Sequence, residues 1–201
     1  MNMTTDKFQD DNFAEEFRGL DLSAAELSLK EFAECTFIDC NFSEARLSRC
    51  IFEDCRFIKC NMSVLKVDGS KFSDVVFEEC KLSGIDWTKA AYSDIMLGSP
   101  FTFLNSVLDY SSFYGLILQE LVMKECRVHD ADFRESDLSF ADLRETDFTD
   151  SLFRNTNLSG ADLTLAENYR IDIYVNTIKG AKFSRYEALS LLESLDITLV
   201  G

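Results

Sequence analysis

Residues 31–60 read EFAEC TFIDC NFSEA RLSRC IFEDC RFIKC, which are six consecutive blocks of five residues with one internal order. The second residue of every block is Phe or Leu, and the fifth is Cys or Ala. Working outward, an apolar residue recurs every five positions from Leu22 to Leu97. After a shift of one residue around the only proline, Pro100, this apolar track resumes at Phe103. It continues to Phe183 and is interrupted once, by the polar Asn168. This period fits neither an α-helix nor a β-strand.

The period of five predicts a polygonal coil in which each block forms one side and turns the chain at its corner. The apolar residue and the small residue two positions before it then point inward, and the other three residues point outward. All seven cysteines fall on the small track: Cys35, Cys40, Cys50, Cys55, Cys60, Cys80 and Cys126. Each coil buries its faces only against neighbouring coils, as in other repeat proteins.

Blocks such as ADFRE (131–135) and ADLRE (141–145) resemble the A(D/N)LXX signature of the pentapeptide-repeat family. The resemblance covers residues 20–183. It implies an all-β fold, a right-handed quadrilateral β-helix with four blocks per coil, in which residues twenty apart stack on one face.

The ends of the chain depart from the repeat. We expect residues 1–19 to form an N-terminal cap, residues 20–183 to form the β-helix with a one-residue slip at 98–102, and residues 184–201 to close the other end. Ser184 and Glu187 fit a capping box that starts a short α-helix, and residues 197–200 read as a strand. This tail either only closes the last coil or forms a dimer interface, and we favour a homodimer through Leu189, Leu192, Leu195, Ile197 and Leu199.

The composition predicts a single domain of 201 residues that stays in the cytoplasm. Acidic residues outnumber basic ones 36 to 20, which gives a net charge of −16. Such a chain repels nucleic acid and anionic membranes. The first residues lack the basic flank and apolar stretch of a signal peptide. No segment reaches the ~18 apolar residues that a membrane span needs, and free thiols are expected in a reducing compartment.

The sequence predicts no enzyme, no metal site and no cofactor. The cysteines are spaced by multiples of the repeat instead of in the close pairs that bind zinc. His129 is the only histidine; we expect it to be exposed beside Asp130 and Asp132, with no nucleophile placed for it. The sequence contains neither a P-loop nor a dinucleotide-binding glycine motif.

The outward residues sort into faces of different charge. The face of Phe32, Phe52 and Phe72 is mainly acidic, and we expect partner contacts at Glu53, Asp54, Asp74 and Asp94. If four-sided stacking survives the slip, this face continues through Phe113 to Asp132 and Glu135. The face of Leu47, Val67 and Trp87 displays Arg46, Arg49, Lys66 and Lys89 instead.

The net charge suggests mimicry of DNA, although acids also serve simply to keep repeat proteins soluble. Spread over about eight coils at ~4.8 Å spacing, it amounts to roughly one charge per 2.5 Å, against ~1.7 Å for duplex DNA.

Several stretches outside the generic repeat are similar to albicidin-resistance pentapeptide-repeat proteins and, more distantly, to Qnr-type quinolone-resistance proteins. They are CKLSGIDWT (80–88), SSFYGL (111–116), RVHDA (127–131), YRIDI (169–173) and LESLDI (192–197). The resemblance implies a homodimeric rod that binds DNA gyrase, in some relatives topoisomerase IV, and relieves poisoning by antibiotics such as albicidin or quinolones. The alternative is a non-enzymatic scaffold or regulator with no topoisomerase role. Qnr proteins of Gram-negative bacteria carry sizeable loops that a one-residue slip does not provide, which favours the loop-free albicidin type.

Overall fold

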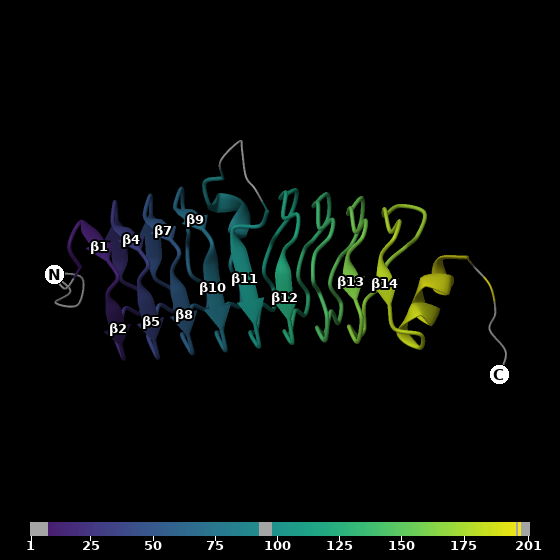
Figure 1. Cartoon of the computed structure of the whole chain (residues 1–201), viewed down its shortest axis with the longest axis horizontal. Helices are drawn as coiled ribbons and strands as arrows, with labels where there is room; N and C mark the ends of the chain where they lie inside the picture. The colour runs from purple at the N-terminus through teal and green to yellow at the C-terminus, as the bar shows by residue number, and fades with distance from the viewer. Residues whose placement is uncertain (1–7, 93–97, 196, 198–201) are drawn as a thin grey trace.

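Most backbone hydrogen bonds in this protein run between coils, and they join each block of five residues to the blocks one coil earlier and one coil later. The computed structural model describes residues 8–92, 98–195 and 197, and in them the chain forms a right-handed quadrilateral β-helix (Figure 1). The strand pairs are parallel, and partners such as Phe37 and Phe57 stand twenty residues apart. The predicted all-β fold is therefore confirmed.

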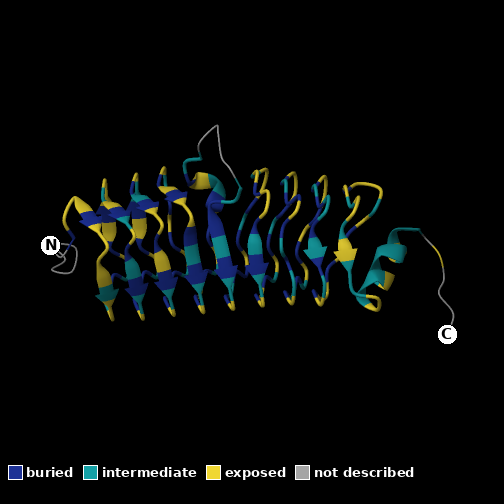
Figure 2. Ribbon diagram, in the orientation of Figure 1, coloured by how far each residue is buried: buried dark blue, intermediate teal, exposed yellow. Residues whose placement is uncertain are grey.

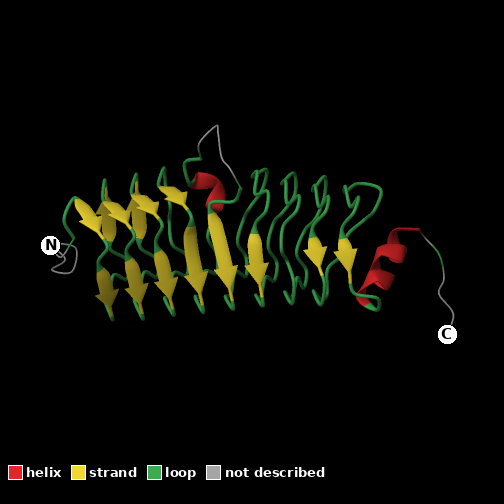
Figure 3. Ribbon diagram, viewed as in Figure 1, coloured by secondary structure: helices red, strands yellow, loops and turns green. Residues whose placement is uncertain are grey.

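The four sides of the coil carry short strands, numbered sides 1 to 4 in chain order (Figure 3). Side 1 holds β1 (Asp11–Phe13), β4 (Glu31–Ala33), β7 (Ile51–Glu53) and β9 (Lys71–Ser73). Side 2 holds β2 (Glu16–Arg18), β5 (Thr36–Ile38), β8 (Arg56–Ile58), β10 (Val75–Glu78), β11 (Phe101–Leu104), β12 (Val122–Lys124), β13 (Asp162–Leu163) and β14 (Lys182–Phe183). Side 3 is joined by isolated bridges, and side 4 holds β3 (Glu26–Ser28) and β6 (Arg46–Ser48). The described residues also include the 3₁₀ helices η2 (Trp87–Lys89) and η3 (Glu187–Leu195).

The corners between sides depend on left-handed backbone. Most corner residues are not glycine, yet they have φ between 48° and 62°, a conformation that costs an L-residue roughly 1–2 kcal/mol. At Asp54 the amide donates to Ser73 in the next coil at 3.0 Å. The ladder hydrogen bonds therefore hold each corner in a conformation that the isolated block would avoid.

Aromatic rings fill the interior as stacks along the axis. Buried residues recur along the coils (Figure 2). On side 2, the ring of Phe57 lies 4.7 Å from Phe37 and 5.2 Å from Phe77, nearly parallel to both. The small track is buried as predicted, and its thiols donate to backbone carbonyls; Cys60 Sγ, for example, lies 3.4 Å from the carbonyl of Phe37. The two inward tracks read from the sequence are therefore the core.

One coil is longer than the others. Phe77 pairs with Phe103, 26 residues later, whereas partners in the preceding coils are 20 apart. The ladder is regular up to the amide of Ala91, and it resumes where the carbonyl of Pro100 accepts from Val75 at 3.0 Å. The one-residue frame shift is thus an insertion of six residues, which lies between these two points. The prediction of a one-residue slip without a loop was wrong because a period of five hides any further insertion of five residues.

The β-helix begins earlier than predicted, because β1 and β2 already pair with the following coil. Phe8 covers the aromatic core at the N-terminal end of the first coil. It is 5% exposed, and its ring packs edge-on against those of Phe17 and Phe32, with centroids 5.1 and 5.3 Å away. The amino group of Lys30 lies 2.7 Å from Asp10. The β-helix therefore starts at Asp11, inside the segment that was expected to form the cap.

At the C-terminal end, η3 covers the last coil (Figure 1). In place of the predicted capping box, Ser184 Oγ accepts from the amide of Leu165 at 2.7 Å, and Glu187 Oε2 accepts from the amide of Asn168 at 3.4 Å. Both side chains thus satisfy the open edge of the last coil. The predicted strand lies, apart from Ile197, outside the described residues. Within the part of the chain that the structure describes, no helix is long and apolar enough to cross a membrane.

We expect Phe57→Ala to lower the free energy of unfolding by about 3–5 kcal/mol, because the ring is fully buried between two stacked neighbours and its removal leaves a cavity. Urea unfolding followed by circular dichroism measures the change. Phe13→Ala is the matched control, since that ring is 66% exposed. Equal stability of the two variants would contradict the assignment of Phe57 to the core.

Candidate partner-binding surface

The outer surface of side 1 carries carboxylates over the first four coils, and we call these residues the acidic face. All are exposed, and one lysine, Lys71, lies among them. The acidic face consists of Asp11, Glu31, Glu34, Glu53, Asp54 and Asp74.

The carboxylates of the acidic face are not neutralised by neighbours. None of them lies within 4.0 Å of a basic group among the described residues. Five of them occupy three successive coils, from Glu31 to Asp74. At ~4.8 Å per coil this is about one negative charge per 3 Å, close to the ~3.4 Å between phosphates along one DNA strand.

The predicted contact residues divide into two groups. Glu53, Asp54 and Asp74 lie together on the acidic face, as expected. Asp132 and Glu135 do not, because Asp132 bridges to Ser112 and, through it, follows Asp86 on side 4. The six-residue insertion moves them around the corner, so the prediction of one continuous acidic face was wrong. Asp94 lies outside the described residues.

Asp132 and Glu135 are also occupied by hydrogen bonds. Arg134 donates to both carboxylate oxygens of Asp132, at 2.9 and 2.8 Å. The hydrogen bonds from Arg134, together with its positive charge, lower the pKa of Asp132. The amide group of Asn155 donates to Glu135 at 2.7 Å. These two carboxylates are therefore less free than those of the acidic face.

Many carboxylates of the C-terminal coils brace the turns of the fold. Asp147 accepts from the amide of Thr149 at 3.1 Å, and Asp162 accepts from the amide of Thr164 at 3.0 Å. Asparagine does the same at Asn157. An aspartate just before the central apolar residue is thus structural.

Hydrogen bonds also change the acidity of these groups. Partial burial by itself raises the pKa of Asp147, but hydrogen bonds from Asn168, Thr149 and His129 outweigh it and lower the value to about 2. Asp162 behaves alike: burial raises its pKa, and bonds from Thr164 and Lys182 bring it to about 2.

The acidic face includes residues that were not among the predicted contacts. Asp11 was assigned to a cap because the polar Asn12 interrupts the apolar track. The sequence did contain a sign that the repeat starts earlier, because Phe17 continues the apolar period of five before Leu22. Glu31 and Glu34 were not among the predicted contacts either, and both are exposed, like Asp54.

The reactive side chains do not converge on a site. Burial raises the pKa of Cys55 and of Cys126 to about 12, so these thiols stay protonated at neutral pH. His129 is half-buried with Nε2 at 2.7 Å from Asp147, one coil away, instead of beside Asp130 as predicted. Among the described side chains, no group of three His, Cys, Asp or Glu residues could hold a metal ion.

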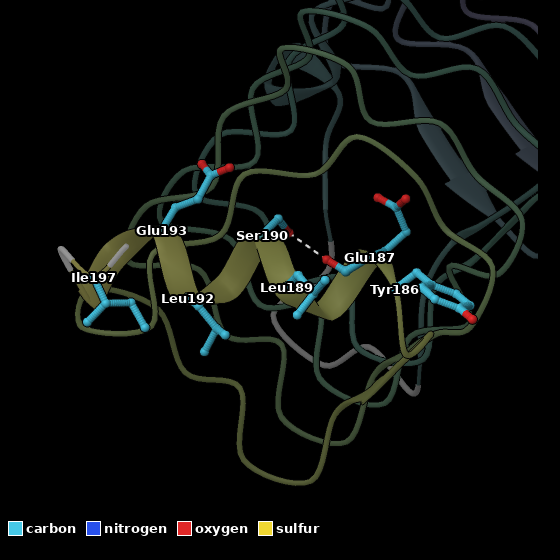
Figure 4. Close-up of a pocket in the computed structure, with 7 residues that line it drawn as sticks. All are labelled: Tyr186, Glu187, Leu189, Ser190, Leu192, Glu193 and Ile197. Atoms are coloured by element: carbon cyan, nitrogen blue, oxygen red, sulfur yellow. Dashed lines mark hydrogen bonds between the residues drawn. The ribbon is translucent and has the colours of Figure 1, made fainter. Parts of the chain in front are cut away.

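A second exposed feature lies on η3. Leu189, Leu192 and Ile197 border a shallow groove of about 230 Å³, and the close-up shows Leu192 and Ile197 projecting from one flank of the helix and Glu193 from the other (Figure 4). Leu189 and Ile197 are about half exposed, at 50% and 53%. Leu195 is half-buried, and Leu199 lies outside the described residues.

Comparison with known proteins identifies the repeat. Residues 30–113 match the pentapeptide repeat region, and residues 131–166 match pentapeptide repeats in eight copies, so that the two matches together span more than half of the chain. No curated protein sequence matches the chain significantly.

Solved structures show the same fold. A trypsin-treated variant of QnrB1, a plasmid-mediated fluoroquinolone resistance protein, is 26% identical with a TM-score of 0.58, covering 97% of this chain and 94% of its own. Full-length QnrB1 is 24% identical with a TM-score of 0.71, covering 96% and 93%. HetL from the cyanobacterium Nostoc sp. strain PCC 7120, involved in heterocyst differentiation regulation, is 15% identical with a TM-score of 0.53, covering 89% and 87%.

We expect the stability of the protein to fall as the pH drops from about 4 to about 2. Asp147 and Asp162 have lower pKa values in the folded chain than in the unfolded chain, so their contribution is complete above about pH 4 and is lost as the folded carboxylates are protonated. Asp147→Asn with Asp162→Asn should flatten this dependence. The fold should persist, because asparagine braces the same turn at Asn157.

Urea unfolding over this pH range provides the measurement. Asp54→Asn with Asp74→Asn is the matched control, because it removes two carboxylates that have no ion-pair partner among the described residues. An acid-induced loss as steep in the Asp147 and Asp162 double variant as in the wild type would show that these braces do not set the pH dependence.

Proposed function

This chain belongs to the pentapeptide-repeat family, and on that premise we propose that it binds DNA gyrase, or topoisomerase IV, and protects it from topoisomerase-poisoning antibiotics such as albicidin or quinolones. In this proposal the protein acts without catalysis, as a mimic of DNA. It would do so in the cytoplasm, where its target acts. The similarity to QnrB1, a fluoroquinolone resistance protein, supports the protective role.

The observation that carries the proposal is the charge of the acidic face. Its carboxylates are exposed, free of ion pairs in the described chain, and spaced along the axis at about the interval of phosphates on one DNA strand. A topoisomerase holds DNA through basic side chains that neutralise phosphates. A rigid rod with carboxylates at that spacing can occupy the same basic surface.

The interaction would be directional. In the N-terminal half, five carboxylates without ion pairs in the described residues line one side over three successive coils, whereas in the C-terminal half the aspartates just before the central apolar residues, such as Asp147 and Asp162, are held in turns. The acidic face would therefore enter the DNA-binding channel of the enzyme, with Glu53, Asp54 and Asp74 at its centre.

The six-residue insertion affects the prediction of which antibiotic the protein protects against. The sequence favoured the albicidin type because it showed no inserted loop. The six-residue insertion between Ala91 and Pro100 means that this reason no longer holds. Both drug classes therefore belong in the test.

We expect the protein to restore gyrase supercoiling at micromolar concentration in the presence of albicidin or a fluoroquinolone. Asp54→Lys with Asp74→Lys should lose this effect, because it places positive charge against a basic surface. Supercoiling is read on agarose gels, with gyrase binding measured in parallel by surface plasmon resonance.

The matched control is Glu125→Lys with Glu145→Lys, which makes the same charge change at corners of side 2 with the same left-handed backbone. Retained rescue in this control and loss in the acidic-face variant support the proposal. Failure of the folded wild type to bind or rescue gyrase would leave the alternative, a scaffold or regulator with another partner.

We also propose that the protein forms a homodimer through the C-terminal segment, because Leu189 and Leu192 of η3 and Ile197 beyond it border one groove, and Leu189 and Ile197 are exposed. Burying such side chains against a second copy contributes roughly 1.5–3 kcal/mol for each that becomes fully buried.

We expect light scattering at micromolar concentration to report a dimer for the wild type and a monomer for Leu189→Arg with Ile197→Arg. Tyr174→Arg is the control, because Tyr174 is exposed but does not border this groove. A wild type that scatters as a monomer would contradict the dimer.

A further inference from the structure

Side 4 continues without a break across the insertion. The ring of Trp87 stacks on Phe113 at 6.2 Å, and Phe113 stacks on Phe133 at 5.0 Å. The outward residues of the C-terminal coils are thereby aligned with the basic residues of the N-terminal half. Side 4 displays Arg46, Arg49, Lys66, Lys89, Arg134, Arg154 and Arg170.

The basic side chains of side 4 continue into the C-terminal half of the protein. Side 4 holds seven of its 20 Lys and Arg residues although the protein has a net charge of −16. Three of them, Arg134, Arg154 and Arg170, line one groove of about 410 Å³ on the C-terminal coils. We call this the arginine groove.

Two guanidinium groups of the arginine groove are available to a ligand. Arg134 is held by Asp132 and lies over the ring of Tyr114 at 5.8 Å. Arg154 and Arg170 are exposed, and neither has a carboxylate within 4.0 Å in the described segments of the chain. They are free to donate paired hydrogen bonds, which suit carboxylates.

Apolar and aromatic side chains accompany these arginines. Leu152 lines the groove and is 49% exposed. Tyr114, beside Arg134, is also 49% exposed. Arginine and tyrosine around an apolar centre are the composition that protein interfaces favour.

We propose that the arginine groove binds an acidic segment of a partner protein. Carboxylates of that segment bond to Arg154 and Arg170, and its apolar side chains contact Leu152. A nucleic acid fits less well, because its continuous phosphates would meet Asp150 in the groove and Glu135 at the corner. The proposal is independent of the topoisomerase role, since this surface lies on side 4 and not on the acidic face.

The test is fluorescence anisotropy with a fluorescein-labelled peptide of alternating Glu and Leu residues at about 0.1 M salt, where the screening length is about 10 Å. We expect the wild type to bind the peptide, and Arg154→Glu with Arg170→Glu to weaken binding by about tenfold or more. Thermal unfolding shows whether this variant remains folded, as expected for two exposed side chains.

The matched control is Arg49→Glu with Lys66→Glu, which makes the same charge change in the N-terminal half of side 4. Wild-type affinity in this control supports the proposal, as does loss of binding when Gln replaces Glu in the peptide. Equal loss in both double variants would mean that binding follows net charge only, and would overturn it. So would absence of binding by the wild type, or equal affinity for a short DNA oligonucleotide. Each result is separate from the outcome with gyrase.

Discussion

The backbone ladder between coils is the interaction on which every other feature of this structure depends. Each block both donates amides to and accepts at its carbonyls from the coil before it and the coil after it, so the blocks must repeat at a fixed spacing and turn at fixed corners. The corners need left-handed residues such as Asp54, and the ladder holds them there. The ends of the ladder leave amides without partners, and Ser184 and Glu187 supply acceptors at one of them. The aromatic stacks fill the space that the ladder encloses.

Because the ladder fixes which residues point inward, the sequence was sufficient to predict the core. The large track through Phe57 and the small track through Cys60 are buried as expected. The register across the insertion could not be obtained in the same way. A period of five is unchanged when five residues are added, so one inserted residue and six give the same pattern. The structure resolves this because Phe77 pairs with Phe103. The number of inserted residues therefore decides which side carries Asp132, and the sequence pattern does not determine that number.

The candidate site was only partly predictable, for a related reason. A carboxylate that points outward can brace a turn or face a partner, and composition does not distinguish them. For most aspartates, position within the block does. Asp132, just before the central apolar residue, reaches the backbone of its own turn, whereas Asp54 and Asp74, at the corner, point away from it. The net charge of −16 therefore overstates the charge available for mimicry of DNA, because part of it is used in holding the coils.

The resulting charge is segregated and not uniform. Carboxylates without ion pairs in the described residues line side 1 in the N-terminal half, and two guanidinium groups without ion pairs there, those of Arg154 and Arg170, lie on the adjacent side 4 in the C-terminal half. A uniformly acidic rod could bind a basic channel in any rotation about its axis, because every side would be equivalent. Here the rotation that places Asp54 and Asp74 in such a channel also fixes the direction in which Arg154 and Arg170 face. A partner with an acidic segment beside a basic channel would then be recognised in one orientation, and DNA, which carries phosphates only, could not make the second contact.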